Sequence, residues 1–321
     1  MAGFSAAPGK FVWDPASADR PLAQACLEVR AGRHGSIREV LAETHHDYYL
    51  RAHRTQILGA LAAGSRMAEE WVADDPGDPD ALLLFARVAV ARALRAGENG
   101  DPVARELAFA AWDAGIEAAK ANDRDPTPWV CLLALARFRD EVVPGPEGVD
   151  APGAWDLLSE VQRRMPWHRE AFHRMLSMFF ARNGGSHASM WEVARWASAC
   201  APPDADPRLL SLVAYAEHYR ARAANTLEAG IAERQWTENM AKVTILNVYD
   251  RWFPSAAERS LVPTADFSLL AHALLMAGHE AEAGRVLAAM RPYANTFPWS
   301  MHGDPAQQLT VAYERCGVRP P

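Results

Sequence analysis

The feature that most constrains the fold is a gapless internal match at an offset of 36 residues. Residues 154–166 read AWDLLSEVQRRMP and residues 190–202 read MWEVARWASACAP, so each segment has a tryptophan followed by an acidic residue and ends on a proline. Such a period is typical of stacked antiparallel helix hairpins, because one hairpin cannot bury its apolar face alone. We therefore expect an α-solenoid in which Trp155 and Trp191 occupy equivalent, buried positions in neighbouring hairpins.

Strong helix formers fill most of the chain, and the alternation of β-branched residues that indicates a strand is almost absent. An oxygen-bearing side chain precedes a proline at Asp78, Thr127 and Asp206. Such a side chain can cap free backbone N–H groups, and the proline suits the first helical position. Residues 255–258, SAAE, resemble a capping box at another helix start. Ordinary helix lengths then predict an all-α fold of about 14–16 helices.

The totals narrow the location and the partners. The formal net charge is −7 and no long block of lysine or arginine occurs, which argues against a nucleic-acid partner. No apolar stretch is long enough for a signal peptide or a membrane span. The four cysteines are far apart and form no CxxC pair, which favours a reduced, cytoplasmic protein. We expect one helical-repeat domain over residues 1–321, with a soft boundary or a mobile loop at the Pro- and Gly-rich residues 142–153.

Three segments carry a resemblance to known proteins. Residues 269–290, LLAHALLMAGHEAEAGRVLAAM, resemble a tetratricopeptide repeat. Residues 71–93 and 165–198 together resemble a large, uncharacterised bacterial family of tetratricopeptide-like helical-repeat proteins. That family has a Gly-Gly-Ser turn followed by His or Glu, matched here by residues 184–187, with Ala194 and Arg195 downstream. The chain departs from the pattern at Asn183, where the family often has Trp. The resemblance implies a tetratricopeptide-like α-solenoid and no particular activity.

The Gly-Gly-Ser-His turn itself has two interpretations. As a helix hairpin turn, Gly184 closes the preceding helix with a positive φ and Ser186 caps the next one. As an anion site, bare amides of Gly184 and Gly185 lie at a helix N-terminus, where a phosphate or carboxylate is favoured. His187 or Arg195 would then add positive charge. A cap needs only one glycine, so the second glycine keeps the anion site open.

Two Glu-x-x-His pairs, Glu43 with His46 and Glu170 with His173, are weak candidates for metal ligands. Spacing of three residues on a helix puts both groups on one face, as carboxylate-bridged di-iron bundles require. Such a bundle also needs two further inward-facing glutamates, and none is evident. We therefore expect no metal and no other cofactor, with both pairs on polar helix faces.

A third cluster occupies residues 166–175, PWHREAFHRM. Helical spacing puts Trp167 and Arg174 near one another, as on a concave solenoid surface that binds a peptide or small ligand. The alternative is an aromatic side chain in the core and an arginine paired at the surface. The GxSxG, GxxxxGK and GxGxxG motifs are all missing from the sequence.

These patterns favour a non-catalytic cytoplasmic adaptor or scaffold that binds a protein or peptide in a concave helical groove, without nucleic acid or membrane. Two other hypotheses stay open. One is an enzyme or small-ligand-binding protein with a pocket lined by His, Trp and Arg, with or without a metal. The other is an anion sensor at residues 184–187.

Overall fold

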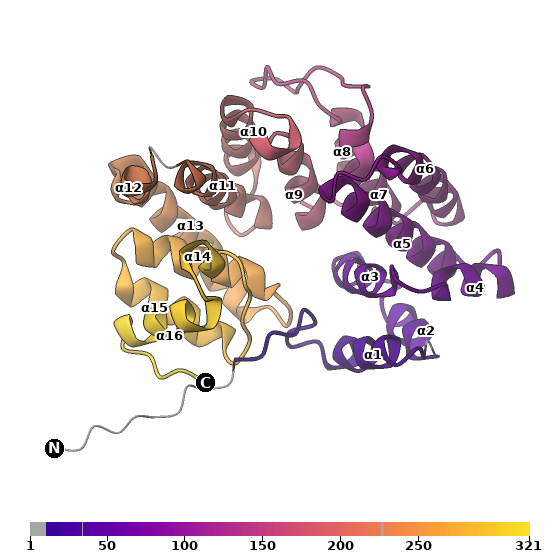
Figure 1. Cartoon of the computed structure of the whole chain (residues 1–321), viewed down its shortest axis with the longest axis horizontal. Coiled ribbons are helices and arrows are strands. Elements are labelled where there is room, and N and C mark those ends of the chain that lie inside the picture. Colours follow the sequence, from indigo (N-terminus) through magenta and orange to yellow (C-terminus); the bar gives the residue numbers. More distant parts are fainter. Residues whose placement is uncertain (1–10, 34, 226–227) are drawn as a thin grey trace. The chain divides into compact units, whose positions relative to one another are not determined.

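The computed structural model describes residues 11–33, 35–225 and 228–321 (Figure 1). These residues form sixteen α-helices and no β-strand, which confirms the prediction of an all-α fold. Two isolated β-bridges join Val12 to Tyr293 and Val143 to Gly153. Within the described part of the chain, every helix is too short or too polar to cross a membrane.

The chain divides into two compact units. We call Asp19–Trp196 the N-terminal unit, and residues 11–18 together with Ala197–Pro321 the C-terminal unit. The Pro- and Gly-rich residues 142–153 lie inside the N-terminal unit, where Val143 and Gly153 exchange two backbone hydrogen bonds of 2.9 and 3.0 Å that close the loop at its base. A single domain over residues 1–321 stays a prediction.

The N-terminal unit is built from helices that follow one another through short connections. They are α1 (Arg20–Arg30), α2 (Gly35–Ala42), α3 (Tyr48–Ala62), α4 (Met67–Asp74), α5 (Pro79–Glu98), α6 (Ala104–Ala121), α7 (Thr127–Leu135), η1 (Ala136–Phe138), α8 (Trp155–Arg164), α9 (Arg169–Met178), η2 (Ala181–Asn183) and α10 (His187–Cys200). The last of these continues past the boundary between the units.

Small side chains set the packing of the long helices in this unit. Helices α5 and α6 bury Ala86, Ala93 and Ala111 in one cluster with residues of α7, and the three helices lie together in Figure 1. Where α3 crosses α5, a Cβ on Gly59 would lie 2.6 Å from the Cβ of Arg87. Glycine is therefore required at this crossing, and it brings the backbone of α3 against Arg87.

The C-terminal unit contains the remaining helices. They are η3 (Asp206–Leu209), α11 (Leu210–Ala224), α12 (Ala229–Ala232), η4 (Glu233–Thr237), α13 (Asn239–Glu258), α14 (Thr264–Met276), α15 (Glu280–Met290), η5 (Trp299–His302) and α16 (Pro305–Arg315). Trp236 and Trp252 are fully buried in its core. Residues 11–18 pack on the same unit, with the ring of Phe11 5.7 Å from that of Tyr313.

The helix starts agree in part with the sequence. The carboxylate of Asp78 accepts from the backbone N–H of Asp80 and caps α5, as predicted. Thr127 is not the cap of α7, because Asp125 accepts from its N–H at 2.8 Å. Asp206 accepts instead from the indole of Trp252 at 2.9 Å, so its carboxylate is used in the core. Residues 255–258 end α13 and start no helix, so that capping box was wrong.

The internal match has a partial counterpart in the structure. Helices α8 and α10 end at Arg164 and Cys200, which are 36 residues apart. Trp155 is the first residue of α8 and is buried, but Trp191 is the fifth residue of α10 and is only partly buried. The expected equivalence of the two tryptophans is wrong, because Ser186 starts α10 one turn earlier relative to the match.

Residues 269–290 form the expected hairpin. Helix α14 ends at Met276, and Gly278 has φ 87°, which lets the chain reverse into α15. The backbone N–H of His279 then bonds to the carbonyl of Leu274 at 2.8 Å. This turn positions the end of α14 in the candidate site of the C-terminal unit.

Candidate functional site

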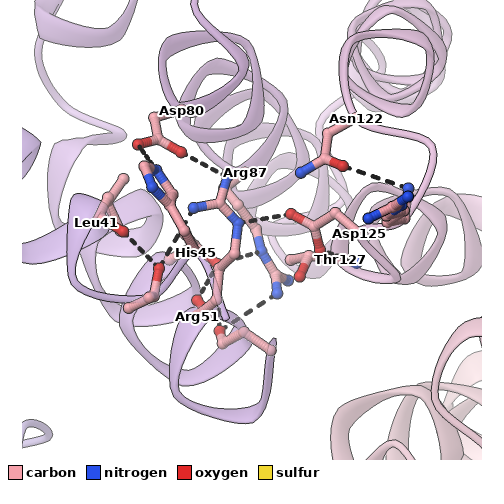
Figure 2. Close-up of polar contacts among 12 residues, drawn as sticks. Leu41, His45, Arg51, Asp80, Arg87, Asn122, Asp125 and Thr127 are labelled. Carbon is pink, nitrogen blue, oxygen red and sulfur yellow. Dashed lines mark hydrogen bonds and ion pairs between the residues drawn. The ribbon is translucent and has the colours of Figure 1, made fainter. Parts of the chain in front are cut away.

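A network of buried arginines and carboxylates lies in the N-terminal unit (Figure 2). The Nε of Arg51 on α3 donates to Oδ2 of Asp125 at 2.6 Å, and its Nη2 lies 2.6 Å from Oδ1 of Asp80. The other oxygen of Asp80 lies 3.2 Å from Nε2 of His45. Arg51 is only 2 % exposed. It therefore ties α3 to the first turn of α5 and to the turn just before α7.

A second buried pair joins α5 to α9. Arg87 donates from Nη1 and Nη2 to the two oxygens of Glu170, at 2.8 and 2.7 Å. Arg174, one turn further along α9, lies 3.2 Å from the same carboxylate. Burial alone would raise the pKa of Glu170, but Arg87 and then Arg174 outweigh it and lower the pKa to about 2. The carboxylate of Glu170 is therefore charged and joins α5 to α9, and both of its oxygens already accept hydrogen bonds from arginines.

The same arrangement recurs at Arg54. Its guanidinium donates to Asp19 at 2.8 and 3.1 Å and to Glu43 at 2.8 Å. Glu43 follows the end of α2 in a turn, because α3 starts only after its cap at Asp47. The prediction that Glu43 and His46 share a helical face is therefore wrong.

The other predicted metal pair does lie on one helix, with Glu170 and His173 both on α9. Glu170 is committed to Arg87. Across the described ranges, no group of three or more His, Cys, Asp or Glu side chains gathers closely enough to hold a metal ion. The absence of a cofactor stays a prediction.

The Gly-Gly-Ser-His turn has the geometry of a helix connection. Gly184 has φ 90° and ends η2, while Oγ of Ser186 accepts from the N–H of Ser189 at 3.1 Å and caps α10, both as predicted. A Cβ on Gly185 would lie 2.4 Å from the carbonyl carbon of Phe179. Close backbone packing therefore explains the second glycine, which was the reason to consider an anion there.

The remaining predicted residues lie around α9 and α10. Trp167, just before α9, is partly exposed and stacks on Phe172 with ring centroids 5.8 Å apart. His187 begins α10 and is partly buried, and Arg195 is exposed on the same helix. Arg174 contacts Glu170 one turn away, as its helical spacing indicates. Roles for Trp167, His187 and Arg195 in ligand binding stay predictions.

A cavity of about 510 Å³ in the C-terminal unit is a stronger candidate. Residues of η4, α13, α14, η5 and α16 line it. Its apolar wall includes Leu275, Met276, Trp299 and Val311. Ligand sites in proteins are clefts of about 300–1,000 Å³ that combine apolar walls with a few polar groups, so this cavity has the size and lining of one.

Two histidines from different helices meet in the wall of this cavity. Nε2 of His272 on α14 lies 2.8 Å from Nε2 of His302 on η5, and Nδ1 of His302 lies 3.4 Å from the hydroxyl of Tyr219. Trp236 and Trp299 flank His272 edge-on, each with its centroid 5.4 Å away. His272 is 1 % exposed, so its imidazole is almost completely shielded from solvent.

Both imidazoles are neutral near pH 7. Burial, together with a smaller effect of the neighbouring His302, lowers the pKa of His272 to about 3. Burial also lowers the pKa of His302, against a smaller opposing effect of Glu233. A neutral pair holds one hydrogen between the facing nitrogens, so it presents hydrogen-bonding groups without net charge.

The loop that carries His302 is fixed by its own polar contacts. The indole N–H of Trp299 donates to Oγ of Ser268 at 3.0 Å, and the side-chain amide of Gln308 donates to the carbonyl of His302 at 3.1 Å. Gly303, with φ 126°, lets the chain leave η5 and enter α16. His302 is therefore held in place before any ligand arrives, which limits the entropy lost on binding.

Sequence reasoning missed His272 and His302. The only local signal at His272 is one polar residue inside the apolar run LLAHALLMA, and His302 sits in WSMHGDP before a helix cap. They are 30 residues apart and on unrelated elements. No periodicity connects them, so only the packing of η5 on α14 brings them together.

No protein-family model matches the chain, and no similar protein was found among curated proteins or among solved structures. The resemblance to a bacterial family of tetratricopeptide-like proteins therefore stays a prediction.

Proposed function

We propose that this protein binds a small molecule in the cavity of the C-terminal unit. The observation that carries the proposal is the cavity of about 510 Å³ with the neutral pair of His272 and His302 in its wall. The hypothesis of a pocket lined by His, Trp and Arg is supported here, since Trp299 and Arg315 also line the cavity. These residues differ from the ones that the sequence favoured.

A pair of matched substitutions tests this proposal. Val311 on α16 lines the cavity and is 43 % exposed, and Val103 in the N-terminal unit is 44 % exposed. Val311→Trp should fill the cavity from its rim without burying new atoms in the core, and Val103→Trp should leave the cavity unchanged. The two variants add the same side chain at equal exposure.

The measurement is a thermal-shift screen of a library of metabolite-sized compounds. We expect at least one compound to raise the Tm of the wild type and of Val103→Trp but not of Val311→Trp, because binding to the folded state raises stability by mass action. If no compound distinguishes the two variants, the cavity is not a ligand site.

A protein-binding adaptor is the second candidate. Met240 and Val243 are 72 % and 61 % exposed and lie three residues apart near the start of α13, so they share one face. Neighbouring exposed apolar side chains favour a protein interface. A partner captured from host extract should be lost with Met240→Asp or Val243→Asp and kept with Val103→Asp, and equal capture by all three would exclude this surface.

The finer fold and location are proposals as well. Helices α5 and α6 pack on one another along their length, as do α14 and α15, and each pair is joined by a short connection. Stacked pairs of this kind support a tetratricopeptide-like solenoid. A cytoplasmic location is supported by the scattered cysteines of the sequence.

A further inference from the structure

Charged side chains in the cavity differ in whether they have a partner. Glu233, Lys242 and Arg315 line it. Arg315 donates to Glu280 at 2.9 Å. In the described part of the chain, neither Glu233 nor Lys242 has an oppositely charged side chain within 4.0 Å. The cavity therefore offers one uncommitted anion and one uncommitted cation.

Lys242 is an unusual residue for its position. The chain has only three lysines among its 33 basic residues, at positions 10, 120 and 242. Lys120 is exposed and pairs with Glu117 at 2.7 Å, whereas Lys242 is partly buried in the first turn of the 20-residue helix α13. The positive end of a helix dipole disfavours a cation there. An anionic group in the cavity would relieve this repulsion.

Glu233 comes from η4, a different element of the lining from α13, which carries Lys242. Glu233 is exposed at the start of η4, and its charge opposes the lowering of the pKa of His302 that burial causes. The neutral pair of His272 and His302 in the same lining cannot balance a negative charge. A cationic group on the ligand would pair with Glu233.

From this distribution we propose that the cavity binds a zwitterion with an apolar side chain, such as a free amino acid of the leucine, methionine or phenylalanine type. The carboxylate would pair with Lys242 and the ammonium group with Glu233. The side chain would pack on Leu275, Met276 and Trp299, which line the apolar wall. A ligand with one charge would leave the other protein charge partly desolvated and unpaired, which costs free energy. This inference rests on the proposed function of the cavity.

Calorimetric titration with charge-deleted analogues tests it. L-leucine carries both charges, L-leucinamide lacks the carboxylate, and N-acetyl-L-leucine lacks the ammonium group. The wild type should bind each analogue about tenfold or more weakly than leucine, the expected loss of one charged hydrogen-bonding pair. Methionine and phenylalanine should likewise bind more tightly than their own amide and N-acetyl analogues.

Substitutions assign each charge to its partner. Lys242→Gln should remove the preference for leucine over leucinamide and keep the preference over N-acetyl-leucine, and Glu233→Gln should do the reverse. Lys120→Gln and Glu258→Gln, which change charges outside the cavity lining, should behave as the wild type. This crossed pattern would not arise if either residue acted only through the stability of the fold.

Each other result overturns the inference. Equal binding of leucine and both analogues excludes recognition of two charges. The amino acids could fail to bind while another compound raises the Tm of the wild type but not of Val311→Trp. In that case the zwitterion is wrong and the cavity remains a ligand site. If Val311→Trp abolishes the effect of no compound on the Tm, the proposed function fails along with this inference.

Discussion

Nε2 of His272 lies 2.8 Å from Nε2 of His302, so the two imidazoles share one hydrogen. Nδ1 of His272 is buried and has no hydrogen-bond partner. An orphaned buried N–H is rarer than an unfilled acceptor. We infer that His272 carries its hydrogen on Nε2 and donates it to His302, whose Nδ1–H then donates to Tyr219 at 3.4 Å. The hydrogen bonds then run in one direction, from His272 through His302 to Tyr219.

The first prediction concerns these tautomers. Long-range ¹H–¹⁵N NMR spectra near pH 7 should show His272 with an unprotonated Nδ1 and His302 with a protonated Nδ1. The His272→Gln variant identifies the signals of His272 by their loss. An Nδ1–H tautomer at His272 would reverse the direction of the hydrogen bonds and contradict this assignment.

The second prediction concerns acid stability. Burial lowers the pKa of His272 from 6.5 to about 3. Below pH 6.5 the unfolded chain takes up a proton that the folded chain refuses, so the free energy of unfolding falls as the pH falls towards 3. His272→Leu should reduce the slope of the free energy of unfolding against pH by at most about 1.4 kcal/mol per pH unit. Urea denaturation between pH 7 and pH 4 measures it.

The exposed His46→Gln variant is the control for that experiment, because His46 lies outside the core. It should reproduce the wild-type dependence on pH. If His272→Leu loses stability with falling pH as steeply as the wild type, the imidazole of His272 is not the group that resists protonation.

The third prediction concerns the buried ion pair between α5 and α9. Glu170→Gln should lower the free energy of unfolding by about 3–5 kcal/mol, because it leaves Arg87 buried without a counter-charge. Glu117→Gln, which breaks the exposed pair with Lys120, should cost less than about 1 kcal/mol. Equal costs in urea denaturation would mean that burial of the Arg87 pair contributes nothing.

The double variant Arg87→Met/Glu170→Met separates the lost pair from the unpaired charge. It should cost less than the sum of the two single substitutions, since neither charge is left alone in the core. An additive result would show that the two side chains act independently.

Local features of the fold could be predicted from the sequence. Helix formers, the cap at Asp78 and the turn at Gly184 depend on residues within one or two helical turns, and the structure has them as expected. The prediction that Glu43 lies on a helix was wrong, because α2 ends at Ala42. The sequence has no strong helix stop signal at that point.

The candidate site could not be predicted, because its pairs are distant in the chain. Arg87 contacts Glu170 across 83 residues and reads in the sequence as one more arginine on a helix. His272 and His302 meet only through the packing of an irregular segment on α14. Such contacts depend on tertiary packing, on which hydrophobic periodicity carries no information.

The last prediction separates the two glycines of the turn after α9. Gly184 has φ 90° with nothing near its missing Cβ, so Gly184→Ala should cost about 1 kcal/mol through backbone strain alone. Gly185→Ala would place a Cβ 2.4–2.5 Å from backbone atoms of Phe179, and the two segments must move apart. Overpacking of this kind costs about 1–3 kcal/mol, so Gly185→Ala should be the more damaging change. Urea denaturation of both variants, with Ser186→Ala at about 1 kcal/mol for the lost cap, ranks them. If Gly185→Ala is neutral while His187→Ala abolishes sulfate binding, the second glycine serves an anion and not the close contact with Phe179.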